Sequence, residues 1–229
     1  MTDRIIAGIE QIREGRECSR IEAFSDGVFA IAITLLVLDL IQVPAGAVGE
    51  NLLGVYLHHW PRFLSFFIGF LTILVCWINH HHMFLYIRRF DSRLMWLNGF
   101  LLFLVTFAPF PTAILAQYVT TGGRGAVATF GFGYFLMACA YNFLWSYAFS
   151  HDLLIKDGDR EFFLAVRTTY RYASAYNFVA FFVCFLSIPL AIVMYLVMFS
   201  VFAFPKEFAA RLARKTSARR HGQRATQEN

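Results

Sequence analysis

Apolar runs long enough to cross a lipid bilayer dominate this sequence and constrain its fold more than any other feature. A helix needs about 20 predominantly apolar residues to span the hydrocarbon core. Six segments are candidates, at residues 23–41, 63–86, 94–119, 126–150, 168–187 and 189–205. The sequence therefore predicts an all-α integral membrane protein, with a six-helix transmembrane domain over residues 1–205 and a basic tail over residues 206–229.

The last apolar run, residues 176–204, is the hardest to divide because it is too long for one span and short for two. Pro189 interrupts it, and proline breaks helices because it lacks the backbone N–H and clashes with the preceding turn. We therefore end the fifth helix at Ser187 and begin the sixth at Pro189. The fifth helix then starts within the polar segment VRTTYRYASAYNF, so an arrangement with five spans stays open.

Lysine and arginine are distributed unevenly between the two predicted sides of the membrane. With the N-terminus inside, the inner segments 1–22, 87–93, 151–171 and 206–229 hold four, three, four and seven of them, and the outer segments hold Arg62 and Arg124. Cytoplasmic loops of membrane proteins carry such an excess of basic residues. The distribution predicts a multi-pass cell-membrane protein with both termini in the cytoplasm, whereas five spans would place the basic tail outside.

The composition also favours a membrane protein over a soluble one. Hydrophobic residues make up 58% of the chain and charged residues 15%, whereas soluble domains average about 45–50% and about 25%. The net charge of +5 follows from the basic inner segments. We interpret residues 206–229 as a solvated tail near anionic lipid and not as a nucleic-acid-binding segment.

The sequence gives little support for a metal or catalytic site. The cysteines stand singly, without the close pairs typical of disulfide frameworks or zinc sites. The run His80–His82 could suggest a metal site, but successive residues of a helix point to different sides. Ser25 and Asp26 with these histidines could suggest a hydrolase, yet no G-x-S-x-G turn is present. We therefore predict that the protein is not an enzyme and binds no cofactor or resident metal.

The first predicted helix has two different faces. At about 100° per residue, one stripe about 100° wide contains mainly aliphatic residues and one hydroxyl group: Gly27, Ile31, Thr34, Leu35 and Leu38. Asp26 lies well off this stripe, and a buried unpaired charge is costly in a membrane. Asp26 therefore needs polar partners, and candidates occur at the matching level of neighbouring segments: Arg20, Trp77, Asn79, His80–His82 and Asn98.

The start of the first helix resembles a known signature. Arg20 followed by Phe24-Ser25-Asp26, in RIEAFSDGVFAIAITLL, is similar to the RxxxFSD signature of the transmembrane protein 175 family, the lysosomal and endosomal potassium channels and their bacterial relatives. The segments WINHH (77–81) and LNGFLLFLVTFAPFPTAIL (97–115) resemble the next two helices of that family. The signature occurs once, as in the bacterial members with one six-helix repeat. His82 and the long basic tail have no match in the family pattern.

The resemblance implies a homotetramer whose first helices line a central pore for potassium ions. It implies that rings of aliphatic side chains narrow this pore, in place of the TVGYG carbonyl filter of other potassium channels. By position, Ile31 forms the first ring, Thr34 faces the pore beyond it, and Leu35 and Leu38 follow. The signature residues Arg20, Phe24, Ser25 and Asp26 would be structural and would tie the inner end of the first helix to Trp77, Asn79 and His80.

Two other functions are compatible with the sequence, a secondary carrier and a non-conducting membrane assembly protein. A carrier should present substrate-binding polar groups near the middle of the membrane, where the first helix offers only Thr34. A potassium-permeable cation channel, with membrane lipid, monovalent cations and other copies of the chain as partners, is the interpretation that we carry forward.

Overall fold

The computed structural model describes residues 2–41, 51–118, 123–155 and 158–203, and the predicted basic tail at 206–229 lies outside these residues. Within them the regular elements are helices, joined by one isolated bridge between Ile87 and Leu154. In chain order the helices are α1 Thr2–Leu35, α2 Val37–Ile41, α3 Leu52–His58, α4 Trp60–Phe84, α5 Ser92–Phe107, α6 Pro109–Tyr118, α7 Arg124–Ser150, α8 Arg160–Leu186 and α9 Ile188–Ala203. The fold is therefore all-α over the described residues.

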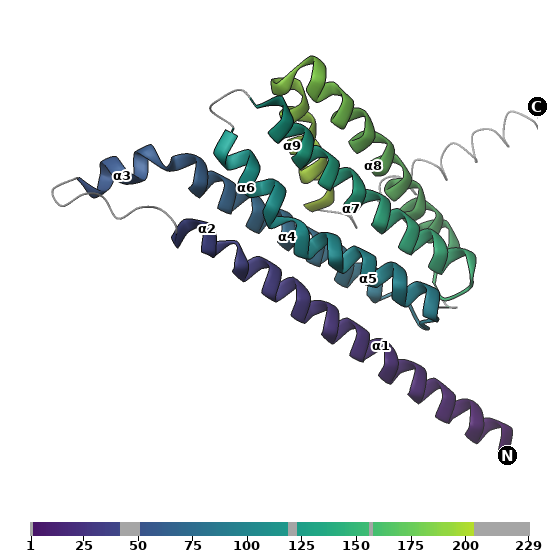
Figure 1. Cartoon of the computed structure of the whole chain (residues 1–229). Coiled ribbons are helices and arrows are strands. Elements are labelled where there is room, and N and C mark those ends of the chain that lie inside the picture. Colours follow the sequence, from purple (N-terminus) through teal and green to yellow (C-terminus); the bar gives the residue numbers. More distant parts are fainter. Residues whose placement is uncertain (1, 42–50, 119–122, 156–157, 204–229) are drawn as a thin grey trace, which may run out of the picture.

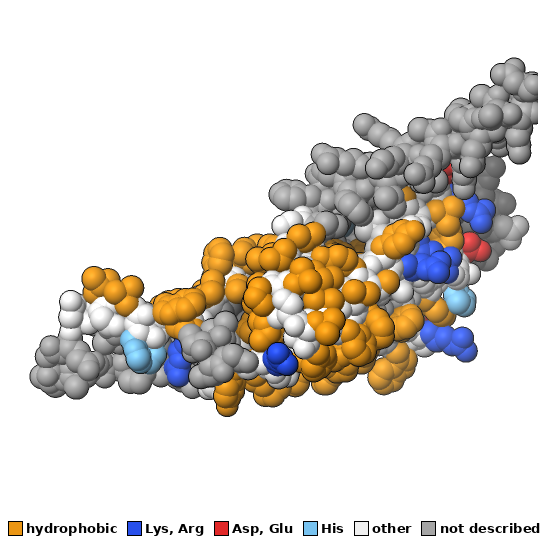
Figure 2. Space-filling view, turned by 90° about the horizontal axis from the view of Figure 1, so that it is seen from above, with side chains coloured by type: hydrophobic (Ala, Val, Ile, Leu, Met, Phe, Trp, Pro, Cys, Tyr) orange, Lys and Arg blue, Asp and Glu red, His pale blue; other side chains and the backbone are white. Residues whose placement is uncertain are grey.

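Among the described residues, three helical stretches are long and apolar enough to cross a membrane: Trp60–Phe84, Ser92–Leu115 and Arg124–Ser150. α1 and α8 are less apolar because charged and polar residues fill their first halves, and α9 is a shorter apolar helix of 16 residues. In the space-filling view, hydrophobic side chains cover most of the middle of the molecule, and charged side chains gather chiefly at one end (Figure 2). This surface suits a bilayer, and the number of six crossings stays a prediction.

The helices form an elongated bundle with α1 along one edge (Figure 1). α1 packs against α4 and α5, and its first turns project beyond the other helices (Figure 1). α7 occupies the centre and packs against α5, α6 and α8. α9 lies against α8 and α4, across the bundle from α1 (Figure 1). In the part of the chain that the structure describes, one face of α1 therefore has no partner.

Helix boundaries follow from capping residues and prolines. Asp91 caps α5 by accepting a hydrogen bond from the Leu94 amide at 2.7 Å, and it also accepts one from the Tyr147 hydroxyl at 2.6 Å. Partial burial tends to raise the pKa of Asp91, but these hydrogen bonds outweigh it and hold the pKa below its ordinary value. Asp159 caps α8 through the Glu161 amide at 2.9 Å. Each cap satisfies a backbone donor that a helix start leaves unpaired.

Several helices begin or end at residues other than those that the sequence predicts. The first helix begins at Thr2 and not at residue 23, and it is interrupted at Leu36. The third divides at Ala108, where Pro109 and Pro111 follow and cannot donate backbone hydrogen bonds. The fifth begins at Arg160, eight residues before its predicted start, because the Asp159 cap initiates it. A short helix, α3, occupies part of the predicted outer loop.

The break between the last two helices lies where the sequence predicts it. α8 ends at Leu186 and α9 begins at Ile188, one residue before Pro189, with Ser187 extended between them. The two helices pack through small side chains, since Ala180 and Ala191 are both completely buried. Small residues let membrane helices approach closely.

Gly131 on α7 makes room for α9. A Cβ atom built on Gly131 would overlap the hydroxyl oxygen of Tyr195, whereas one built on Gly133 would meet Pro111 at an ordinary 3.5 Å. Tyr195 is buried among α7, α8 and α9. The close approach of α7 and α9 therefore requires a residue without a side chain at position 131.

We predict that Gly131→Ala lowers the thermal unfolding temperature in detergent although alanine favours helices by about 0.5–1 kcal/mol over glycine. Gly133→Ala, the matched control on the same helix, should not lower it. Removing the hydroxyl in Gly131→Ala/Tyr195→Phe should restore part of the loss. A Gly131→Ala protein as stable as Gly133→Ala would contradict this close contact.

Candidate functional site

α1 has one buried face and one open face. Ser25, Phe29, Ala32 and Leu36 are between 0% and 5% exposed and pack toward α4 and α5. The four residues predicted to line a pore are all exposed: Ile31, Thr34, Leu35 and Leu38, the aliphatic three at 60%, 43% and 50%. We call these four residues the open stripe. The structure places them together on the face that the chain leaves uncovered.

The interruption after Leu35 divides the open stripe. Ile31, Thr34 and Leu35 belong to α1, whereas Leu38 belongs to α2. The Thr34 hydroxyl donates to the Ile31 carbonyl oxygen at 2.9 Å. Its proton is therefore used within the helix, and the oxygen lone pairs stay available on the open side.

The opposite face of α1 is fixed by a chain of buried polar groups. The Ser25 hydroxyl donates to the Ile21 carbonyl oxygen at 2.8 Å and accepts from the Asn98 amide nitrogen at 3.0 Å. The Asn98 amide oxygen lies 3.0 Å from Nε2 of His80, which must donate because an amide oxygen only accepts. Ser25, Asn98 and His80 are at most 3% exposed. We call these three residues the buried triad; it joins α1, α5 and α4.

A second pair of contacts joins α1 to α4 beside the buried triad. The Trp77 indole donates to the Asp26 carboxylate at 2.8 Å, and His81 Nδ1 lies 3.2 Å from the Glu22 carboxylate. The Trp77 and His81 rings stack with centroids 5.8 Å apart. Glu22 lies one turn before Asp26 on α1, and its partner His81 lies one turn after Trp77 on α4. The two helices therefore run antiparallel with a fixed register.

Glu14 holds the first half of α1 against the α4–α5 connection. Its carboxylate lies 3.7 Å from Arg88 Nε and 3.6 Å from Arg89 Nη1, and the Cys18 thiol donates to the Arg88 carbonyl oxygen at 3.0 Å. Partly exposed ion pairs of this kind contribute little stability each. They do keep α1 aligned with the loop where the bundle ends.

Three of the seven residues predicted for the structural network do not join it. Arg20 and Phe24 are exposed, and no hydrogen bond or ion pair of Arg20 with α4 or α5 occurs among the described residues. They lie eleven and seven residues before Ile31, which places them on the same side of the helix as the open stripe. Among the described residues Asn79 makes no hydrogen bond to α1; its amide donates to the carbonyl oxygens of Val75 and Phe202, both at 2.8 Å.

Sequence reasoning missed Glu22 as a partner and named His81 and Asn98 only as candidates. A signal was present, because Glu22 lies four residues before Asp26 and His81 four residues after Trp77. Residues four apart share a helix face. Antiparallel packing then brings the two pairs together. Among the described residues, no group of three His, Cys, Asp or Glu side chains lies close enough to hold a metal ion.

Comparison with known proteins identifies the family. The model of a family described as "Endosomal/lysosomal potassium channel TMEM175" matches residues 20–109. A potassium channel of Chamaesiphon minutus is 45% identical over 179 residues, which cover 76% of this chain and 88% of that protein. The chain belongs to the TMEM175 family. The family match begins at Arg20 and includes the open stripe, the buried triad and the Asp26–Trp77 contact.

Other TMEM175 proteins extend the comparison. The crystal structure of a lysosomal potassium-selective channel TMEM175 homolog from Chamaesiphon minutus superposes with a TM-score of 0.74 at 40% identity, over 83% of this chain and 98% of that chain. The endosomal/lysosomal proton channel TMEM175 of Gallus gallus is 44% identical over 89 residues, but these cover only 18% of that protein. The structural likeness thus reaches beyond the segment that the family model matches.

We predict that Asn98→Leu destabilises the protein, because it leaves the His80 ring N–H without an acceptor. An unsatisfied buried polar group costs about 1–3 kcal/mol. Unfolding of the purified protein in detergent would measure the loss. Arg20→Ala is the control and should leave the stability of the chain unchanged, because Arg20 is exposed. Equal stability of Asn98→Leu and the natural protein would show that the buried triad is not a structural anchor.

Proposed function

We propose that the chain is a subunit of a homotetrameric, potassium-permeable cation channel in which α1 of each copy lines a central pore. The observation that carries this proposal is the open stripe, four exposed residues of α1 and α2 that lie opposite the anchored face of α1. One helix cannot enclose a pore, but four copies arranged around an axis can. The potassium channel of Chamaesiphon minutus at 45% identity supports the same function.

The chemistry of the open stripe suits a constriction that controls water. Ile31 to Leu38 extends over about 10 Å at about 1.5 Å per residue. Rings of aliphatic side chains over such a length gate by excluding water from the pore. Potassium sheds its hydration shell more easily than sodium, so such a ring favours potassium without supplying many ligands. Thr34 adds one hydroxyl oxygen per subunit just beyond the Ile31 ring.

The proposed membrane arrangement has six crossings per subunit, with both termini in the cytoplasm. α4, the α5–α6 stretch and α7 have the required length and hydropathy. α1, α8 and α9 complete the six in this proposal. In it the loops beside Arg88 and Asp159 face the cytoplasm, which agrees with the excess of basic residues in the inner segments.

Purified protein in liposomes should conduct potassium faster than sodium. Potassium, sodium and proton gradients should be applied separately, because the relative from Gallus gallus is a proton channel by name. Saturable exchange that depends on a counter-substrate would indicate a carrier. If correctly folded protein gave no ion flux, the result would support a non-conducting assembly protein. Mass measurement in detergent should give four copies, and a stable monomer would contradict the pore.

Ile31→Asn should place polar groups on the pore axis and raise sodium permeation relative to potassium. The control is Val193→Asn on α9, which introduces the same group at a residue 54% exposed, compared with 60% for Ile31. Leu36 is unsuitable as a control because it is only 5% exposed and packs in the core. Reversal potentials in mixed solutions provide the readout. If Ile31→Asn and Val193→Asn gave the same ion preference as the natural protein, Ile31 would not form the constriction.

A further inference from the structure

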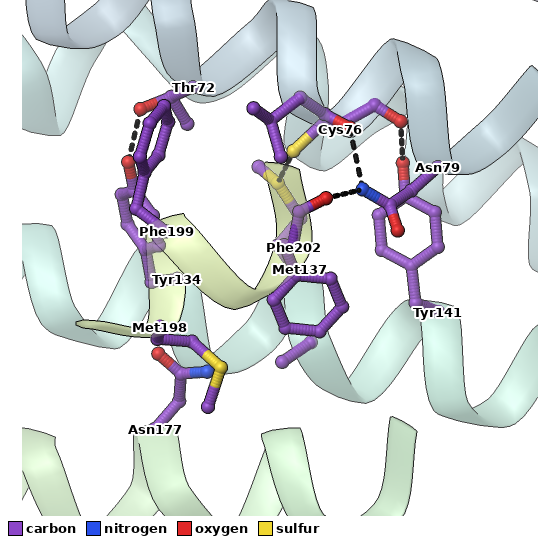
Figure 3. Close-up of a pocket in the computed structure, with 12 residues that line it drawn as sticks. Thr72, Cys76, Asn79, Tyr134, Met137, Tyr141, Asn177, Met198, Phe199 and Phe202 are labelled. Carbon is purple, nitrogen blue, oxygen red and sulfur yellow. Dashed lines mark hydrogen bonds between the residues drawn. The ribbon is translucent and has the colours of Figure 1, made fainter. Parts of the chain in front are cut away.

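A small cavity lies inside the subunit, away from the open stripe. It has a volume of about 60 Å³ and is lined by side chains of α4, α7, α8 and α9 (Figure 3). Its wall is almost entirely apolar apart from a few hydroxyl and amide groups. The proposed pore does not use it, since none of the open-stripe residues lines it.

Two amide groups on this wall have a buried oxygen without a donor. Asn79 on α4 and Asn177 on α8 are each 2% exposed. The Asn79 nitrogen donates to two carbonyl oxygens, and the Asn177 nitrogen donates to the Ala173 carbonyl oxygen at 2.9 Å. These acceptors fix which end of each amide is the nitrogen. Both Oδ1 atoms are fully buried and receive no hydrogen bond from the described residues.

The other hydroxyl and thiol groups on the wall already donate hydrogen bonds to other acceptors. The Thr72 hydroxyl donates to the Ile68 carbonyl oxygen, so the Tyr134 hydroxyl beside it donates to Thr72 (Figure 3). The Tyr141 hydroxyl donates to the Cys76 carbonyl oxygen at 2.6 Å, and the Cys76 thiol donates to Met137 Sδ at 3.0 Å. None of these donors is left for the two amide oxygens.

The occupant must therefore be small, neutral and rich in donors. An apolar molecule would leave both oxygens unpaired, which is costly in a low-dielectric interior. A cation would lack a compensating charge, because none of the described residues that line the cavity is acidic. A water molecule has two donors and needs about 10–15 Å³ of such volume, so the cavity has room for more than one. We propose that this cavity is a buried water site, in which water donates to Asn79 and Asn177.

Such water would link two parts of the bundle. Asn79 belongs to α4, which holds α1 through Trp77 and His80, whereas Asn177 belongs to α8, which packs chiefly on α7 and α9. Water donating to both amides supplies a polar connection from α8 to α4, the helix that anchors α1. The site is separate from ion permeation and does not depend on the proposed function.

Radiolytic hydroxyl labelling of the protein in nanodiscs tests the site, because radicals formed from a bound water oxidise adjacent methionines. Met137 lines the cavity and is 6% exposed, whereas Met83 is 2% exposed and lies outside it. Met95, which is 51% exposed, is the positive control. We expect Met137 to be oxidised well above Met83, although both are buried. Equal, slow oxidation of Met137 and Met83 in the natural protein would overturn the proposal.

A variant shows whether the amide oxygen holds the water. Asn177→Leu keeps a side chain of similar size and removes the acceptor, so Met137 oxidation should fall toward that of Met83. Asn142→Leu, which removes an amide outside the cavity, should leave it unchanged. Unchanged oxidation of Met137 in Asn177→Leu would also overturn the assignment. The comparison of Met137 with Met83 in the natural protein decides the question even where Asn177→Leu does not fold.

Discussion

The hydrogen bonds of the buried triad set the rotation of α1 about its own axis, and the position of every other residue on that helix follows from them. Ser25, Asn98 and His80 come from three different helices, and each depends on the next for a hydrogen bond. A rotation of α1 by one residue, about 100°, would remove Ser25 from Asn98 and leave buried polar atoms unpaired. The triad therefore determines which face of α1 is buried and which is open.

Aromatic packing makes this arrangement rigid. The His80 ring stacks on Phe84 with centroids 4.0 Å apart and lies 5.2 Å from the Phe29 ring. These contacts place the Nε2 proton in the direction of Asn98. In the membrane interior, a polar group without a protein partner has no water with which to form a hydrogen bond. Near Ser25, α1 is thus held in one orientation by these hydrogen bonds and ring contacts.

Much of this fold could be predicted from the sequence, because long apolar runs and Pro189 carry strong local signals. The open stripe was found from helical periodicity, since Ile31, Thr34 and Leu35 recur at the spacing of one helix face. The start of α1 at Thr2 was missed because the charged residues before residue 23 leave no apolar run. The start of α8 was missed for a similar reason, although Asp159 is a typical cap.

The polar contacts were less predictable because they depend on how helices meet. The sequence placed Asn79 next to Asp26, but on α4 it faces α9 and donates to Phe202. Periodicity does separate Asn79 from His80, which is one residue and about 100° away. Periodicity cannot show whether Asn79 or His80 is the residue that points toward α1. Arg20 and Phe24 belong to the signature by pattern, and the chain alone leaves both exposed.

The two ends of the open stripe are held by different forces. Near Ile31 the helix is fixed by hydrogen bonds, since Asp26 and Ser25 precede it by less than two turns. At the interruption between α1 and α2, the chain is held by the packing of Leu36 against α4. This packing is close, because a Cβ atom built on Gly69 of α4 would lie only 3.0 Å from Leu36 and 3.1 Å from Thr112. Hydrogen bonds weaken steeply when their angles change, whereas apolar contacts tolerate small sliding. Ile31 is accordingly the more tightly positioned residue of the stripe and Leu38 the less constrained one.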